Sequence, residues 1–203
     1  TSITIEEALA HPTWSMGKKI SIDSATLANK GLEVIEAAKL FNFEAQNIKV
    51  VIHPQSFIHS MIQTQDGAFY AQISPPSMKQ LILYALNYLE NKENQLPNLD
   101  FSQAFSMDFS PPRMNDFPML SLAYQTLEKK GSWPIAYNAA NEVFVEAFLN
   151  GKIDLAQAES ISDLVSADSQ RAAEIARSHL QGKLSAQIEA IRAAIAADNL
   201  PCK

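Results

Sequence analysis

The sequence predicts an α+β fold, in which a mixed segment containing a small mixed sheet is followed by an α-helical bundle. Residues 1–90 combine helical patterns with short strand-like runs and an Asp66-Gly67 hairpin turn. Residues 91–117 are rich in Pro and Asn and predict a linker, whereas residues 118–203 carry only helical patterns. We therefore expect three parts, bounded as 1–90, 91–117 and 118–203.

The first elements follow from a cap and from hydrophobic spacing. Thr4 followed by Glu7 predicts a capping box that begins a short helix ending before Pro12. Residues 19–22 alternate polar and apolar side chains, which predicts a half-buried strand. Residues 24–41 have apolar side chains at helical spacing and predict a helix.

The next elements should form the sheet. Residues 48–52 predict a buried strand, and residues 57–64 and 68–73 predict the two arms of a hairpin. Residues 78–89 predict a helix. Three phenylalanines in the linker recur every four residues and should dock on other parts of the chain: Phe101, Phe105 and Phe109.

The bundle should contain four helices, over about 118–130, 134–150, 154–166 and 169–198. Gly131 and Gly151 lie where glycine commonly follows a helix C-terminus. Asp154 and Asp168 lie where N-caps are expected. The chain beyond Pro118 is therefore predicted to be helical.

Composition excludes several classes of function. The chain has 6 glycines among 203 residues, and no two lie closer than fourteen residues, which excludes a dinucleotide-binding or P-loop glycine motif. The net charge of −6 argues against a general nucleic-acid binder. The longest apolar run, residues 81–86, is too short to span a membrane. A single cysteine, Cys202, gives no sign of an oxidising compartment, so we expect a cytoplasmic protein.

Polar side chains with phosphate-binding potential gather in residues 11–33. Ser24 is expected at a helix N-terminus, where free N–H groups favour an anion, and Asn29 and Lys30 lie close by. Glu33, one turn after Asn29, could hold a divalent cation. A solvated amphipathic helix explains the same residues, and the residues alone leave both interpretations open.

Other polar candidates are weaker. His53 and His59 share a strand parity and could ligate a metal, but one core and one surface histidine fit the spacing better. Asn138, Asn141 and Glu142 are better explained by hydrogen bonding between helices or by capping than by a site. His179, without polar neighbours in sequence, is expected at the surface.

Five strings together resemble the 1-deoxy-D-xylulose 5-phosphate reductoisomerase family. They are HPTWSMG at 11–17, KISIDSAT at 19–26, NKGLE at 29–33, IHPQSFIHSM at 52–61 and NAANE at 138–142. The resemblance covers essentially the whole chain. It implies an enzyme of the non-mevalonate isoprenoid route that rearranges 1-deoxy-D-xylulose 5-phosphate and reduces the product with NADPH to 2-C-methyl-D-erythritol 4-phosphate. A divalent ion, Mg²⁺, Mn²⁺ or Co²⁺, polarises the substrate carbonyl in that family.

The resemblance also implies roles for particular residues. Ser24, Asn29 and Lys30 hold the substrate phosphate, and Glu33 binds the metal and the substrate. His11, which also touches substrate, and Trp14 belong to a lid over the site. The remaining implied residues are His59 as a catalytic histidine, Met16 and Met78 as contacts to the cofactor, and Pro76 in a loop bordering the site.

The chain departs from the family pattern in extent. It begins just upstream of the lid, so the family's NADPH-binding domain, two further acidic metal ligands and a serine phosphate loop have no counterpart in it. We therefore expect a truncated, C-terminal half of the enzyme that is inactive by itself and binds neither metal nor NADPH well. We expect it to form a homodimer through residues 48–73.

Two alternatives belong to other classes of function. The chain could be a non-catalytic dimerisation or interaction module of the same ancestry, and the coding sequence upstream would distinguish the two. An acidic helical adaptor built on residues 118–198 is the third interpretation. It does not explain why Ser24, Asn29, Lys30 and Glu33 fall together.

Overall fold

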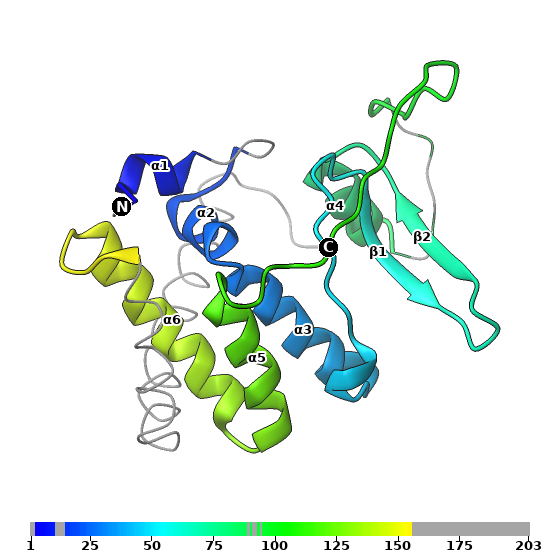
Figure 1. Ribbon diagram of the computed structural model, residues 1–203. Helices are drawn as coiled ribbons and strands as arrows, with labels where there is room; N and C mark the ends of the chain where they lie inside the picture. The colour runs from blue at the N-terminus through cyan, green and yellow to red at the C-terminus, as the bar shows by residue number, and fades with distance from the viewer. Residues whose placement is uncertain (1–2, 11–14, 89, 91–92, 94, 156–203) are drawn as a thin grey trace, which may run out of the picture. The chain divides into compact units, whose positions relative to one another are not determined.

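The computed structural model describes residues 3–10, 15–88, 90, 93 and 95–155 (Figure 1). These residues fall into two compact units, which are treated separately. The first unit takes the described residues of Thr1–Ala10, Met16–Lys49 and Arg113–Lys203. The second takes those of His11–Ser15 and Val50–Pro112. Helices dominate the first unit and the second holds a small antiparallel sheet, so the predicted α+β class is confirmed.

The first unit is a helical assembly in which distant parts of the chain pack together. Its elements are α1 (Ile5–Leu9), α2 (Lys18–Ala25), α3 (Ala28–Phe41), the short 3-10 helix η1 (Ala45–Asn47), α5 (Pro118–Lys129) and α6 (Trp133–Leu149). Helix α3 packs mainly on α5, and α6 contacts α2, α3 and α5. The core that they enclose includes Ile22, Ala28, Ile35, Met119, Leu122, Ala123, Ala136, Tyr137, Phe144 and Phe148. This packing places the start of α3 against α6.

The expected strand at residues 19–22 is wrong, because these residues belong to α2. Four alternating residues are too few to separate a period of 2 from one of 3.6. Ile22 is fully buried whereas Ile20 is 40% exposed, so the two isoleucines do not share a buried face as a strand would require. Side chains also bond back into the helix, as when Thr26 Oγ1 donates to the carbonyl of Ile22 at 3.0 Å.

The expected continuous helix over residues 24–41 is interrupted. Leu27 adopts the left-handed conformation, with φ 56 and ψ 17, and separates α2 from α3. Ser24 therefore lies in the last turn of α2, and the expectation that it begins a helix is wrong. No glycine marks this turn, which is why the sequence pattern did not indicate it.

Local signals at the helix ends are confirmed. Thr4 and Glu7 form the predicted capping box, with Glu7 N–H donating to Thr4 Oγ1 at 3.2 Å and Thr4 N–H donating to Glu7 Oε2 at 2.8 Å. Helices α5 and α6 match their predicted ranges to within a residue. Gly131 and Gly151 have φ values of 60 and 67 directly after the caps of these helices, as expected. The helices expected within 154–198, with Asp168, His179 and Cys202, involve residues 156–203 and so lie outside the described residues.

The second unit contains the predicted hairpin. Strand β1 (Ile58–Gln63) pairs antiparallel with β2 (Phe69–Ile73), and Ile62 lies opposite Tyr70. Gly67 has φ 87 in the connecting turn, where Asp66 Oδ1 accepts from the amide of Ala68. Helix α4 (Met78–Leu86) follows, capped by Ser77. The strand expected at 48–52 is wrong, since only an isolated bridge joins Ile52 to Ser110.

His53 organises the segment before the hairpin. Its Nε2 accepts the amide N–H of Phe57 at 3.1 Å, so its Nδ1 carries the proton and donates to the carbonyl of Asp108 at 2.9 Å. The imidazole stacks on Phe109, with ring centroids 4.7 Å apart, and Phe105 meets Phe57 edge-on. The predicted docking of linker phenylalanines is confirmed for Phe105 and Phe109. His53 is thus a structural residue.

The two compact units cut across the division expected at residue 90. Residues 16–49 group with residues 113–155 because α3 packs on α5, a long-range contact that chain order does not reveal. The expected division into 1–90, 91–117 and 118–203 stays a prediction. In the described part of the chain, no helix is long and apolar enough to cross a membrane.

Replacing Gly31 by Ala is expected to lower the free energy of unfolding by about 1–3 kcal/mol. A β-carbon at Gly31 would lie 2.4 Å from the hydroxyl oxygen of Tyr137 and 2.9 Å from Cβ of Ala123. This overlap outweighs the gain of about 1 kcal/mol in helix propensity that alanine brings. Urea unfolding followed by circular dichroism measures the difference.

Gly17→Ala is the matched control, because a β-carbon there meets no heavy atom within 4 Å. It should change the free energy of unfolding by less than about 1 kcal/mol. Adding Tyr137→Phe to Gly31→Ala removes the nearest clashing atom and should recover part of the loss. Equal losses for Gly31→Ala and Gly17→Ala would contradict the close packing of Tyr137 and Ala123 against Gly31.

Candidate functional site

The candidate site lies at the turn between α2 and α3. A left-handed conformation at a leucine costs about 1 kcal/mol, so surrounding contacts must hold Leu27 in it. The turn ends α2 and starts α3 at Ala28. The first N–H groups of a helix have no acceptor in the preceding turn, and together with the helix dipole they favour an anion.

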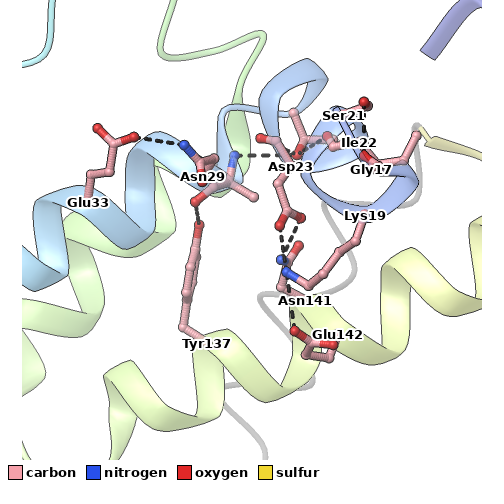
Figure 2. A network of polar contacts seen from close by, with 12 residues as sticks. Gly17, Lys19, Ser21, Ile22, Asp23, Asn29, Glu33, Tyr137, Asn141 and Glu142 are labelled. Carbon is pink, nitrogen blue, oxygen red and sulfur yellow. Dashed lines mark hydrogen bonds and ion pairs between the residues drawn. The ribbon is translucent and has the colours of Figure 1, made fainter. Parts of the chain in front are cut away.

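Three polar side chains that the sequence places close together meet at the start of α3. Asn29 Nδ2 donates to Glu33 Oε1 at 2.7 Å, and Lys30 Nζ pairs with Glu33 Oε2 at 2.5 Å. Figure 2 shows Asn29 reaching Glu33 along the helix. The side chains of Lys30 and Glu33 are 37% and 45% exposed, so solvent and a ligand can reach them. The group holds amide and ammonium donors balanced by one carboxylate.

The other predicted site residues are distributed over both units. In the first unit, Ser24 is half-buried in the last turn of α2, and Met16 is half-buried just before that helix. In the second unit, His59 lies on β1, where its Nε2 is 3.1 Å from Ser74 Oγ, and Met78 begins α4 with 55% of its surface exposed. His11 and Trp14, expected to form a lid, lie outside the described residues. Ser24, Asn29, Lys30 and Glu33 therefore belong to one unit.

A divalent metal is not accommodated by the described residues acting alone. Among them, no three His, Cys, Asp or Glu side chains gather closely enough to hold an ion. Glu33 offers one carboxylate, and both of its oxygens are engaged by Asn29 and Lys30. Hard divalent cations need several oxygen ligands. A divalent ion would therefore need further ligands from outside the described residues.

A buried polar network underlies the turn (Figure 2). The carboxylate of Asp23, on α2, is 3% exposed; Oδ2 pairs with Lys19 Nζ at 2.5 Å and Oδ1 accepts from Asn141 Nδ2 at 2.8 Å. Lys19 also reaches Glu142 at 3.2 Å. Burial lowers the pKa of Lys19, but the hydrogen bonds and charges of Asp23 and Glu142 outweigh it and hold that pKa above its usual value.

Tyr137 forms a second buried link to the same turn. It lies one turn before Asn141 on α6, and its hydroxyl donates to the carbonyl of Ala28 at 3.2 Å. The side chain has no exposed surface. Burial, and then the negative charge of Asp23, raises the pKa of Tyr137 far above its usual range. The residue is therefore a permanent hydrogen-bond donor at physiological pH.

Sequence reasoning assigned no role to Asp23, Lys19 or Tyr137. The i, i+4 spacing of Lys19 and Asp23 was a visible signal of an ion pair on one helix. For Asn141, hydrogen bonding between helices was the favoured interpretation, and it is confirmed by the bond to Asp23. The partner itself could not be inferred, because 118 residues separate the two.

Two family models match most of this chain. A family model described as the DXP reductoisomerase C-terminal domain matches residues 73–195. A second model, the 1-deoxy-D-xylulose 5-phosphate reductoisomerase C-terminal domain, matches residues 1–41. The chain belongs to the 1-deoxy-D-xylulose 5-phosphate reductoisomerase family, and the resemblance noted from the sequence strings is confirmed.

Curated relatives share about half of their aligned residues with this chain. The 1-deoxy-D-xylulose 5-phosphate reductoisomerase of Treponema denticola is 53% identical over 165 residues, which are 81% of this chain and 43% of the relative. That of Clostridium botulinum strain Okra is 54% identical over 160 residues, or 79% of this chain and 41% of the relative. The chain thus spans less than half the length of these relatives.

Solved structures of the family have the same fold. A DOX-P reductoisomerase in complex with NADPH, fosmidomycin and magnesium superposes with a TM-score of 0.79 at 36% identity, covering 88% of this chain and 50% of the other. The Zymomonas mobilis enzyme in complex with NADPH gives a TM-score of 0.73 at 37% identity, covering 87% of this chain and 47% of the other. NADPH and magnesium are therefore ligands of solved relatives.

Tyr137 should make the free energy of unfolding depend on alkaline pH. The unfolded chain releases the phenol proton near pH 10, whereas the folded chain keeps it, so stability is intact below pH 10 and falls as the pH rises above it. At pH 11 the loss in the free energy of unfolding is about 1.4 kcal/mol. Urea unfolding of the parent chain and of Tyr137→Phe, at pH 8 to 11, isolates the effect as a difference.

Tyr137→Phe should be less stable than the parent at pH 8 by about 1 kcal/mol, because the bond to Ala28 is lost. The gap should close as the pH rises to 11. Parallel pH profiles for the two proteins would contradict the buried, protonated phenol.

Proposed function

We propose that this chain provides the substrate-phosphate site and part of the metal site of a 1-deoxy-D-xylulose 5-phosphate reductoisomerase. That enzyme isomerises 1-deoxy-D-xylulose 5-phosphate and reduces it with NADPH to 2-C-methyl-D-erythritol 4-phosphate. The observation that carries the proposal is the cluster of Asn29, Lys30 and Glu33 directly after the left-handed turn at Leu27. Membership of the family supports the assignment of the reaction.

The phosphate would be held by hydrogen-bond donors that gather at the start of α3. The backbone N–H groups of Asn29 and Lys30, the side-chain amide of Asn29 and the ammonium of Lys30 are the donors at the start of α3, whereas the N–H of Ala28 already donates to Thr26 Oγ1. The hydroxyl of Ser24, from the last turn of α2, adds a fourth kind of donor. The ligand has to compete with Glu33 for Lys30, since these two side chains are already paired. Binding to this chain by itself is accordingly weak.

Glu33 would contribute one carboxylate ligand to a divalent ion, Mg²⁺, Mn²⁺ or Co²⁺. Such an ion supplies a Lewis acid that polarises the substrate carbonyl. The hydrogen bonds from Asn29 and Lys30 hold the carboxylate of Glu33 along the first turn of α3. Phosphate and metal functions then share one helix turn, so a bound phosphate and a bound ion would be placed relative to one another by α3.

The remaining roles rest on matching sequence strings. His11 and Trp14 would close over the substrate as a lid, His11 touching substrate and the indole excluding water. His59 would be a catalytic histidine, and Met16 and Met78 would contact NADPH. Because this chain holds no glycine-rich dinucleotide motif, the 203-residue polypeptide taken by itself should turn over no substrate and should bind NADPH and metal poorly.

Inorganic phosphate should bind at the start of α3 with a dissociation constant of about 1 mM or weaker, the affinity that a few charge-assisted hydrogen bonds leave after desolvation. Titration should shift the NMR amide signals of Ser24, Asn29 and Lys30. Lys30→Ala should abolish the shifts at Ser24 and Asn29.

Lys39→Ala serves as the control, because Lys39 is exposed in the last turn of the same helix and its loss changes the net charge equally. Its titration should match that of the parent chain. If phosphate shifted only signals elsewhere, such as Lys152, or if Lys30→Ala left the response intact, the phosphate site would be refuted. The alternative of a non-catalytic interaction module would then be favoured.

We further propose that the chain forms a homodimer through residues 48–73. The hairpin leaves large apolar side chains uncovered: Ile62 is 66% exposed, Phe69 61% and Tyr70 67%. An isolated two-stranded hairpin is marginally stable in water, and apolar side chains uncovered on both of its faces call for a partner surface. A second copy of the chain would cover this surface.

Ile62→Glu should convert the dimer into a monomer of 22.4 kDa at micromolar concentration, because it places a charge within the apolar surface of the hairpin. Light scattering after size-exclusion chromatography measures the mass. Leu40→Glu is the control, since Leu40 is 76% exposed on α3 and outside the hairpin. A parent chain that is already monomeric under these conditions would refute the proposal.

A further inference from the structure

We propose that Asn141 and Tyr137 of α6 are positioning residues that hold the α2–α3 turn, and through it the groups of the phosphate site. This inference rests on the proposed function for its ligand, but the contacts that carry it do not. The two residues are four apart on α6, so they face the same side of the helix. One reaches α2 before the turn and the other reaches α3 after it.

The first link fixes the end of α2. Asn141 is fully buried and donates from Nδ2 to Oδ1 of Asp23, four residues before Leu27. Lys19 holds the second oxygen of Asp23, so the carboxylate is fully engaged. A buried carboxylate that lost either partner would be left uncompensated, which makes this arrangement highly specific. Asn141 therefore determines where α2 ends relative to α6.

The amide of Asn141 acts as a hydrogen-bond donor to Asp23. Its Oδ1 is buried and has no hydrogen-bond partner among the described residues, a cost that an apolar side chain of the same shape would avoid. Figure 2 shows its amide turned toward Asp23. An asparagine is needed here because its N–H₂ group donates without adding charge. An aspartate would set a second carboxylate against Asp23.

The second link fixes the start of α3. Tyr137 donates to the carbonyl of Ala28, the first residue of α3, and its ring fits against Gly31, which has no β-carbon to obstruct it. Leu27, in its left-handed conformation, lies between the two anchored points. Asn29 and Lys30 follow directly. Among the described residues, their side chains donate hydrogen bonds only to Glu33, within α3, and the contacts that reach the turn from another helix come from α6.

The test compares Asn141→Asp with the reciprocal double variant Asp23→Asn/Asn141→Asp. The single variant should raise the dissociation constant for inorganic phosphate at least fivefold. The double variant has one carboxylate and one amide, as the parent pair has, with their positions exchanged. An amide donor again faces a carboxylate, so the dissociation constant should return to within twofold of the parent value. Gln125→Glu adds the same charge at an exposed position on α5 and should change the constant less than twofold.

Hydrogen exchange separates this role from general loss of stability. The amides of Thr26 and Gly31 donate to the carbonyls of Ile22 and Leu27, one at the end of α2 and the other at the start of α3, so they flank the turn. In Asn141→Asp they should exchange at least tenfold faster, while Leu122 in the α5 core changes less than threefold. If Asn141→Asp does not fold, Asn141→Leu, which adds no charge, takes its place with the same expectation at Thr26 and Gly31.

The inference would be overturned by exchange that accelerates equally at Thr26, Gly31 and Leu122, or by a double variant that behaves like the single one. Unchanged exchange at the turn in Asn141→Asp would also overturn it. If the parent chain bound no phosphate, the proposed function would fail, and exchange at Thr26 and Gly31 would still decide whether α6 positions the turn.

Discussion

The buried carboxylate of Asp23 constrains how the helices of the first unit meet. A carboxylate in a residue that is only 2% exposed needs partners for its oxygens, since a buried charge without a partner costs several kcal/mol. Lys19 satisfies one oxygen from within α2, but the other depends on Asn141 of α6. Helix α6 cannot slide past α2 without breaking that bond. This bond is one of the two links from α6 to the α2–α3 turn, and the other is the bond from Tyr137 to Ala28.

Apolar packing supplies most of the stability of the first unit, and the polar contacts select how its helices align. The core of the first unit is built from α3, α5 and α6, with small residues where the helices come closest. Gly31 and Ala123 admit the ring of Tyr137 against α3, so its hydroxyl reaches the carbonyl of Ala28. Buried apolar area alone would tolerate several alignments of these helices. The bonds of Tyr137 and Asn141 select one of them.

The second unit is organised differently. Its order comes from a few specific contacts: a tight turn with a left-handed Gly67, the ring of His53 bonded to Phe57 and Asp108, and the bridge from Ile52 to Ser110. Most side chains of its hairpin stay exposed, including large apolar ones such as Phe69 and Tyr70. A unit of this kind buries too little surface to be rigid alone. This is the physical basis for assigning its apolar surface to a second copy.

Interactions between near neighbours were determined by the sequence itself. The capping box of Thr4 and Glu7, the Asp66-Gly67 hairpin, and the shared face of Asn29, Lys30 and Glu33 each depend on residues at most four apart, so short patterns predicted them. The family resemblance rests on strings of similar length. Only the tertiary structure decided that residues 19–22 are helical, that Leu27 breaks the helix, and that Asp23 meets Asn141. The physical reason is that these features depend on burial against α6, whose residues lie more than a hundred positions away and whose approach no local pattern encodes.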